Sequence, residues 1–213
     1  MSAPTGLFNR KDKSSPAYYG PSQTALLLLD FHSFLVEKAL PEDAGQAVVE
    51  IAVKLRDWAK SKGILVIHGL VDAKGTPFAT CKDQVVFANV QKMMSETDGG
   101  DEPAALTEGV DEDEPTFFRL PGYVSALRSP GLPQFLMTKG ITSLMICGIS
   151  TSGCVLRTSM AATDLEFVVT VIEDACADPH QEVHDMLVKK VMPNRGYVAN
   201  AAEFMEGFER ARG

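Results

Sequence analysis

The sequence predicts an α/β protein of three layers, in which helices cover both faces of a mainly parallel central sheet. Residues 25–29 and 64–67 are continuous apolar runs without alternation, which is typical of parallel strands buried on both faces. Between them, residues 44–62 repeat apolar side chains at helical spacing until Gly63, which indicates a helix. A strand, a helix and a second strand in this order predict a right-handed crossover between parallel strands.

The length of the chain favours a single domain. The 213 residues include 45% hydrophobic and 23% charged side chains, the composition of an ordinary folded protein. Residues 1–22 contain several glycine, serine and proline residues, so we expect an irregular N-terminal arm there. Residues 23–213 are expected to form the domain itself.

The composition also limits the classes of partner. The net charge is −8 and no cluster of Lys and Arg occurs, which argues against nucleic acid or an anionic membrane and favours a small-molecule substrate. No apolar run approaches the roughly 18 residues of a membrane span, and residues 9–15 lack the apolar core of a signal peptide, so a cytoplasmic location is expected. The four cysteines show no CxxC spacing and the four histidines are scattered, so we expect reduced thiols, no metal and no cofactor.

The remaining segments continue the alternation of strands and helices. In chain order, we expect a helix over 77–94, a strand over 116–120, a helix over 132–139, a strand over 144–149, a helix from 154 to 163, a strand over 167–172 and helices over 181–190 and 201–210. Residues 95–115 are acidic and rich in glycine, which favours a solvated loop, while a lid over the site is the open alternative.

Three of the predicted strands end at residues that carry chemistry, namely Asp30, Arg119 and Cys154. Ligands of open α/β sheets bind at the carboxyl ends of the strands, so these three side chains are expected to meet. Cys154 follows a turn of small residues at the start of a predicted helix, where the helix dipole favours a thiolate nucleophile. A small buried hydrophobe is the alternative for Cys154, and a side chain that braces the following loop is the alternative for Asp30.

Several neighbours of these residues are candidates for the substrate pocket. They are His32, Phe34, His68 and Thr151, which follow the first, second and fourth predicted strands. Phe34 is equally consistent with core packing, and His68 with a hydrogen bond at a strand end.

Two stretches resemble the isochorismatase-like cysteine hydrolases, a family that includes nicotinamidases and N-carbamoylsarcosine amidohydrolase-like enzymes. Residues 25–30 resemble its first strand with the catalytic aspartate. Residues 148–155, Gly-Ile-Ser-Thr-Ser-Gly-Cys-Val, resemble its G-x-x-T-x-x-C-V turn, and Thr158 with residues 161–164 extends the match. The resemblance covers residues 24–204 and implies the isochorismatase-like, Rossmann-like hydrolase fold and a homo-oligomer.

The resemblance also implies a mechanism. Cys154 would attack an amide-like carbonyl carbon and form an acyl-enzyme, with Asp30 as the proton acceptor and Arg119 completing the catalytic triad. The backbone N–H groups of Ser150 and Cys154 would bind the oxyanion, and the peptide bond between Ile149 and Ser150 would be cis.

The chain departs from the family pattern at two places. Arg119 stands where the family carries a lysine, and no Asp-x-His metal cluster follows the second strand. Two alternatives to an amide hydrolase therefore stay open. One is hydrolysis of the vinyl ether of isochorismate, and the other is a binding or interaction protein with impaired catalysis.

Overall fold

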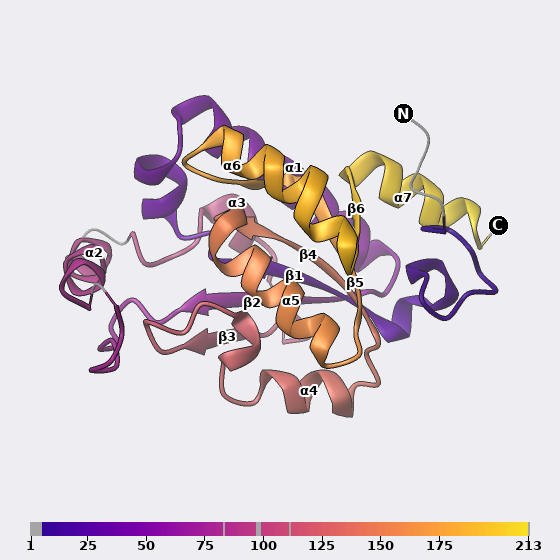
Figure 1. Cartoon of the computed structure of the whole chain (residues 1–213), viewed down its shortest axis with the longest axis horizontal. Helices are drawn as coiled ribbons and strands as arrows, with labels where there is room; N and C mark the ends of the chain where they lie inside the picture. The colour runs from indigo at the N-terminus through magenta and orange to yellow at the C-terminus, as the bar shows by residue number, and fades with distance from the viewer. Residues whose placement is uncertain (1–5, 83, 97–98, 111, 213) are drawn as a thin grey trace.

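The computed structural model describes residues 6–82, 84–96, 99–110 and 112–212. Its centre is a six-stranded sheet in the order β3-β2-β1-β4-β5-β6, and all five neighbouring pairs are parallel. Helices lie on both faces of the sheet, with α5 on the near side in Figure 1 and α1 on the far side. The three-layer α/β/α fold predicted from the sequence is confirmed.

The middle of the sheet is strand β1, Thr24–Leu29, whose six residues are all buried. It pairs with β2, Leu65–Val71, on one side and with β4, Ser143–Ile149, on the other. The edges are β3, Thr116–Arg119, beyond β2, and β5, Val168–Ala177, followed by β6, Tyr197–Ala199, beyond β4. The chain reverses its direction of winding between β1 and β4, which is where doubly wound sheets open a crevice for ligands.

Amphipathic helices close the core from both sides. On one face, α1, Glu42–Ser61, packs beside α7, Ala201–Arg210, and the ring of Trp58 meets those of Phe204 and Phe208 at centroid distances of 6.2 and 5.5 Å. The other long connections carry α4, Leu132–Thr138, α5, Leu156–Asp164, and α6, Gln181–Met186. Within the described residues, no helix is long and apolar enough to cross a membrane.

The N-terminal segment that the structure describes has no α-helix or β-strand before β1. It forms turns and two short 3-10 helices, Pro16–Tyr18 and Pro21–Gln23. Leu7 and Ala17 are nevertheless buried, because this segment packs against the domain.

Several boundaries differ from the sequence-based prediction. The helix expected over 77–94 begins only at Gln84, since α2 spans Gln84–Glu96, and residues 77–82 are irregular. Strand β2 continues to Val71 and β5 continues to Ala177, so each is longer than predicted. Strand β6 has only three residues and was not predicted, because so short a run carries no periodicity.

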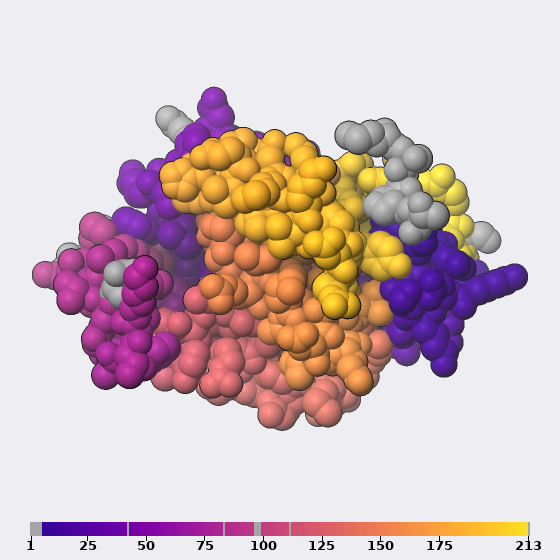
Figure 2. All heavy atoms as spheres, viewed as in Figure 1, coloured from indigo at the N-terminus to yellow at the C-terminus, as the bar shows by residue number. Residues whose placement is uncertain are grey.

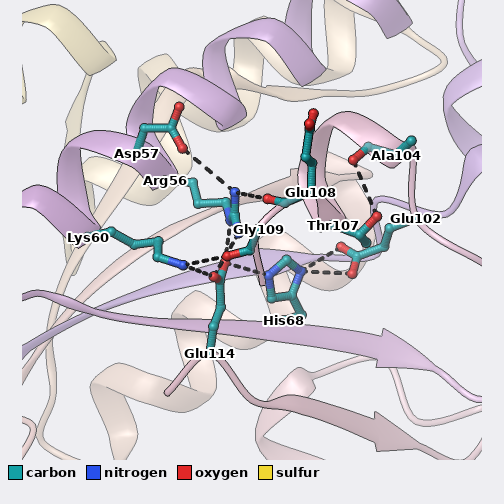
Figure 3. A network of polar contacts seen from close by, with 10 residues as sticks. All are labelled: Arg56, Asp57, Lys60, His68, Glu102, Ala104, Thr107, Glu108, Gly109 and Glu114. Carbon is teal, nitrogen blue, oxygen red and sulfur yellow. Dashed lines mark hydrogen bonds and ion pairs between the residues drawn. The ribbon is translucent and has the colours of Figure 1, made fainter. Parts of the chain in front are cut away.

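The acidic segment between α2 and β3 is not a solvated loop throughout. It contains the short helix α3, Ala104–Thr107, and two of its carboxylates, Glu102 and Glu114, are buried. Both contact His68 of β2, Nδ1 lying 2.9 Å from Glu102 Oε1 and Nε2 lying 3.0 Å from Glu114 Oε1 (Figure 3). The prediction of a solvated loop is therefore wrong for these two residues, since a buried histidine and cations supply their partners.

The cations come from α1. Arg56 Nη2 donates to Glu114 Oε2 at 2.8 Å and Lys60 Nζ donates to the same oxygen at 2.7 Å (Figure 3). Burial alone would raise the pKa of Glu114, but the hydrogen bonds from Arg56, Lys60 and His68 lower that pKa to about 2. This charge cluster ties α1 and β2 to the segment that leads into β3.

Candidate active site

A cavity of about 190 Å³ lies at the carboxyl edge of the sheet, where β1, β3 and β4 end. Its wall contains Asp30, Arg119 and Cys154, the three residues that the sequence placed at strand ends. Helix α2 closes one side with Phe87, Val90, Gln91 and Met94. In Figure 1, α2 stands at the left end of the molecule, apart from the other helices, and its atoms lie at the same end in Figure 2.

Asp30 is the first residue after β1 and is 6% exposed. Its backbone has a φ of +52°, a conformation that is uncommon for a residue with a side chain. The carboxylate accepts hydrogen bonds from Val71 N at 3.0 Å, from Arg119 Nη1 at 2.9 Å and from Arg119 Nη2. These donors hold the carboxylate in one orientation in the cavity wall.

Arg119 ends β3 and is 3% exposed. Besides its two bonds to Asp30, it donates from Nε to Tyr123 O at 2.8 Å, so the whole guanidinium is fixed. Burial works against its charge, yet the charge of Asp30 and their hydrogen bonds raise the pKa of Arg119 overall. The site therefore carries a fixed guanidinium that is bonded to the carboxylate of Asp30.

Cys154 lies in the five-residue turn Thr151–Val155, which leads into α5. Gly153 in this turn has φ −95° and ψ −109°, outside the helical region, so the turn and α5 are not one continuous helix. The Cys154 thiol is 3% exposed and donates to Ile149 O at 3.2 Å.

The electrostatics of Cys154 differ from the sequence-based expectation of a stabilised thiolate. Burial and the negative charge of Asp30 raise the pKa of Cys154 well above its ordinary value, and the positive charge of Arg119 lowers it only in part. The free site thus holds a thiol next to a carboxylate that can accept its proton.

The turn reaches the cavity through a glycine and a cis peptide. Gly148 has a φ of +146°, and a Cβ atom built there would lie 2.1 Å from Leu29 O, so only glycine fits against β1. The peptide bond between Ile149 and Ser150 is cis, as the resemblance implied. Ser150 and Cys154 both line the cavity.

The four other predicted pocket residues lie outside the residues that line this cavity. His32 lies behind Asp30, with Nε2 3.8 Å from Asp30 Oδ1 and Nδ1 2.7 Å from Gly100 O. Phe34 is half-buried and its backbone N–H donates to Gly99 O at 3.1 Å. Both residues therefore fix the loop after β1 to residues 99–101.

The side chains of Thr151 and His68 also contact residues outside the cavity lining. Thr151 Oγ1 lies 2.8 Å from Nδ1 of His184, which follows β5 in α6. His68 was predicted at the rim because its strand was expected to end there. Since β2 runs on to Val71, the side chain of His68 instead lies in the charge cluster of Figure 3.

The helix wall of the cavity was missed from the sequence. The apolar spacing of residues 78–93 indicated a helix, but it did not separate the side chains facing the cavity from Val85, Val86 and Met93, which are exposed. Gln91 carried no signal of its own. The described residues contain no group of three or more His, Cys, Asp or Glu side chains that could hold a metal ion.

Comparisons with known proteins identify relatives of this chain and solved structures with the same fold. The chain is 32% identical over 171 residues to a probable inactive nicotinamidase of Arabidopsis thaliana, covering 76% of this chain and 84% of that one. It is 27% identical over 191 residues to a maleamate amidohydrolase of Pseudomonas putida, covering 89% and 88% of the two chains. Among solved structures, a cysteine hydrolase from Pseudomonas syringae superposes with a TM-score of 0.77 at 20% identity, covering 91% and 95%.

The family assignment rests on the match to a family model as well as on these relatives. Residues 24–203 match the model of the isochorismatase domain, which is most of the chain and includes all three strand-end residues of the cavity. The chain therefore belongs to the isochorismatase family.

Proposed function

We propose that this protein is a cysteine hydrolase that cleaves the C–N bond of a small amide through an acyl-enzyme on Cys154. The observation that carries the proposal is the shared cavity of Cys154 and Asp30. Both side chains line the same small cavity, and burial together with the charge of Asp30 raises the pKa of Cys154, so the carboxylate acts on the thiol whose proton it would accept. The maleamate amidohydrolase of Pseudomonas putida supports an amide as the substrate class.

In the first half of the reaction, Asp30 accepts the thiol proton while the sulfur of Cys154 attacks the carbonyl carbon. The carbonyl oxygen becomes negative, and the backbone N–H groups of Ser150 and Cys154 are the proposed donors to it. The C–N bond then breaks, the proton moves from Asp30 to the nitrogen, and ammonia or an amine leaves a thioester on Cys154.

In the second half, water attacks the thioester and gives a proton to Asp30. The C–S bond breaks, the carboxylic acid leaves, and the proton returns from Asp30 to the sulfur. One amide and one water thus give one acid and one amine, with the enzyme unchanged.

Arg119 has a supporting role in this scheme. A guanidinium is not deprotonated in proteins, so Arg119 cannot share the proton transfers and Asp30 carries them alone. Its two hydrogen bonds hold the Asp30 carboxylate in place, and its positive charge partly offsets the effect of Asp30 on the pKa of Cys154. An arginine in place of the family lysine is therefore compatible with turnover.

The dimensions and lining of the cavity restrict the substrate. Its volume of about 190 Å³ admits only a small molecule, and the side chains of Leu35, Val71, Phe87 and Val90 give it an apolar wall. A compact amide with an apolar or unsaturated part fits this lining.

The proposal is tested by measuring ammonia release from a panel of small amides that includes maleamate and nicotinamide. The wild type and Cys81→Ala should hydrolyse the same member of the panel, because Cys81 lies outside the cavity lining. Cys154→Ala should lose this activity. Full hydrolysis by Cys154→Ala would overturn the proposal.

The raised pKa of Cys154 favours a second candidate, a family member that binds small molecules without turning them over. This second candidate predicts that some amides of the panel raise the melting temperature of the protein while none of them is hydrolysed. Hydrolysis of isochorismate is the third candidate function, and it is assayed separately by the release of pyruvate because this reaction gives no ammonia. Hydrolysis of isochorismate by Cys154→Ala would assign the vinyl ether reaction instead.

The resemblance to the family further supports residues 23–213 as the catalytic domain and a homo-oligomer in the cytoplasm. Light scattering of the purified protein tests the oligomer, and a monomeric mass at micromolar concentration would rule it out.

A further inference from the structure

Gln91 is a polar residue in the otherwise apolar wall that α2 gives to the cavity. It is 5% exposed, although glutamine side chains are mostly exposed in proteins. Its neighbours on the same wall include Phe87 and Val90. A buried amide in such surroundings needs hydrogen-bond partners for both of its ends.

One end of this amide has a partner. A nitrogen of Gln91, Nε2, donates to the carbonyl oxygen of Asp72 at 2.8 Å. A carbonyl oxygen only accepts hydrogen bonds, so the end that faces Asp72 must be the NH₂ group. The orientation of the Gln91 amide is thereby fixed.

The oxygen end of the Gln91 amide, Oε1, is buried and has no hydrogen-bond partner within the described part of the chain. Gln91 is one of the residues that line the cavity containing Cys154, so this unpaired acceptor belongs to the wall of that cavity. Burial of a carbonyl oxygen without a donor is unfavourable, and a donor brought by a ligand would relieve it.

We propose that Gln91 Oε1 accepts a hydrogen bond from the N–H of the substrate's carboxamide and so selects a primary amide. This inference rests on the proposed function and names its substrate class. In the bound amide the carbonyl oxygen points to the N–H groups of Ser150 and Cys154, so the NH₂ group points away from them and needs an acceptor. The Asp30 carboxylate is already held by Arg119 and Val71, whereas Gln91 Oε1 is free.

The test compares two alkylating probes, of which only one carries this donor. Iodoacetamide carries a primary amide, and methyl iodoacetate carries an ester without an N–H. Both react with a thiol by forming a C–S bond as iodide leaves, so no turnover is needed. The rate constant for each probe at Cys154 is measured at one pH by mass spectrometry of the Cys154 peptide, and the amide-to-ester ratio is calculated.

Three variants make the comparison specific. Gln91→Met keeps the length of the side chain but cannot accept strongly, and it should lower the ratio about 3- to 10-fold, the worth of one ordinary hydrogen bond. Gln91→Glu keeps an acceptor and should preserve the ratio. Gln84→Met makes the same change on α2 outside the cavity lining and should leave the ratio as in the wild type.

An unchanged ratio in Gln91→Met would overturn the proposal, and so would an equal fall in Gln91→Glu, which would indicate a structural role. If Gln91→Met does not fold, the amide-to-ester ratio of the wild type is compared with that of a free thiol and tests the proposal by itself. The wild-type ratio at Cys154 should exceed that of N-acetylcysteine at least 3-fold, and equal ratios would reject the inference. Because alkylation is independent of hydrolysis, a failure of the proposed reaction would appear only in the amide panel.

Discussion

Arg119 and Asp30 meet through two parallel hydrogen bonds, Nη1 to Oδ1 at 2.9 Å and Nη2 to Oδ2, in a place where both side chains are almost fully buried. Such a pair keeps both charges fixed, and the loss of one partner leaves the other charge buried and unpaired. Removal of one partner should therefore destabilise the fold as well as alter the site.

Replacement of Arg119 by methionine should lower the free energy of unfolding by about 3–5 kcal/mol, because the Asp30 charge loses its partner. Urea denaturation at pH 7 measures this change. Arg157→Met is the matched control, since Arg157 is exposed, and its effect should stay within about 0.5 kcal/mol. A loss below about 1 kcal/mol for Arg119→Met would show that the pair is not needed for stability.

The alkylation of Cys154 should depend on pH in a manner set by Asp30. Burial and the charge of Asp30 raise the pKa of Cys154, so labelling by iodoacetamide should accelerate at higher pH than for a free thiol, whose pKa is about 8.5. Asp30→Asn removes a negative charge and leaves that of Arg119, so it should lower this apparent pKa and speed labelling at pH 7. A profile shifted to higher pH in Asp30→Asn would contradict the arrangement described.

His68 should make the stability of the fold depend on pH. Burial lowers the pKa of His68, but its bonds and charge interactions with Glu102 and Glu114 raise it overall above 6.5. Stabilisation by the charged ring is therefore fully present below about pH 6.5 and is lost as the pH rises through the raised value. The difference in free energy of unfolding between the wild type and His68→Gln should be largest at pH 6 and should narrow towards pH 9.

Urea denaturation across this range checks the effect, and His180→Gln, at an exposed histidine, is the control. A difference between wild type and His68→Gln that is constant with pH would mean that the ring does not titrate between its two carboxylates.

Gly148 should tolerate no side chain. An added Cβ would lie 2.1 Å from the backbone oxygen of Leu29, and the φ of +146° is unfavourable for other residues. Gly148→Ala should therefore cost about 1–3 kcal/mol in the free energy of unfolding and displace the turn that carries Cys154. Gly20→Ala, where an added Cβ has nothing within 4 Å, should be close to neutral. Equal stabilities of the two variants would contradict the close packing of β4 against β1.

The architecture was predictable from the sequence because its strands are long, apolar and separated by periodic helices. Strands β1, β2 and β4 are buried in the middle of the sheet and leave continuous apolar runs, which identified them. The ends of parallel strands meet at one edge, so Asp30, Arg119 and Cys154 could be expected to meet as well.

The remaining features depend on contacts that span the chain. Glu102 and Glu114 read as solvated charges because their partners, His68 and Arg56, are more than 30 residues away in sequence. The raised pKa of Cys154 follows from burial, which the local sequence of a helix start does not encode. Gln91 became visible only as an unpartnered atom in the folded wall.

The most direct test of the account is the intact mass of the protein during turnover. A substrate from the amide panel is mixed with the enzyme, the reaction is quenched in acid within its first turnover, and the adduct is located by peptide mapping. We predict the mass of one acyl group on Cys154, which disappears in Cys154→Ala and persists in Cys81→Ala. Hydrolysis of the amide with no adduct in the wild type and with full activity in Cys154→Ala would contradict the central claim that Cys154 is the nucleophile.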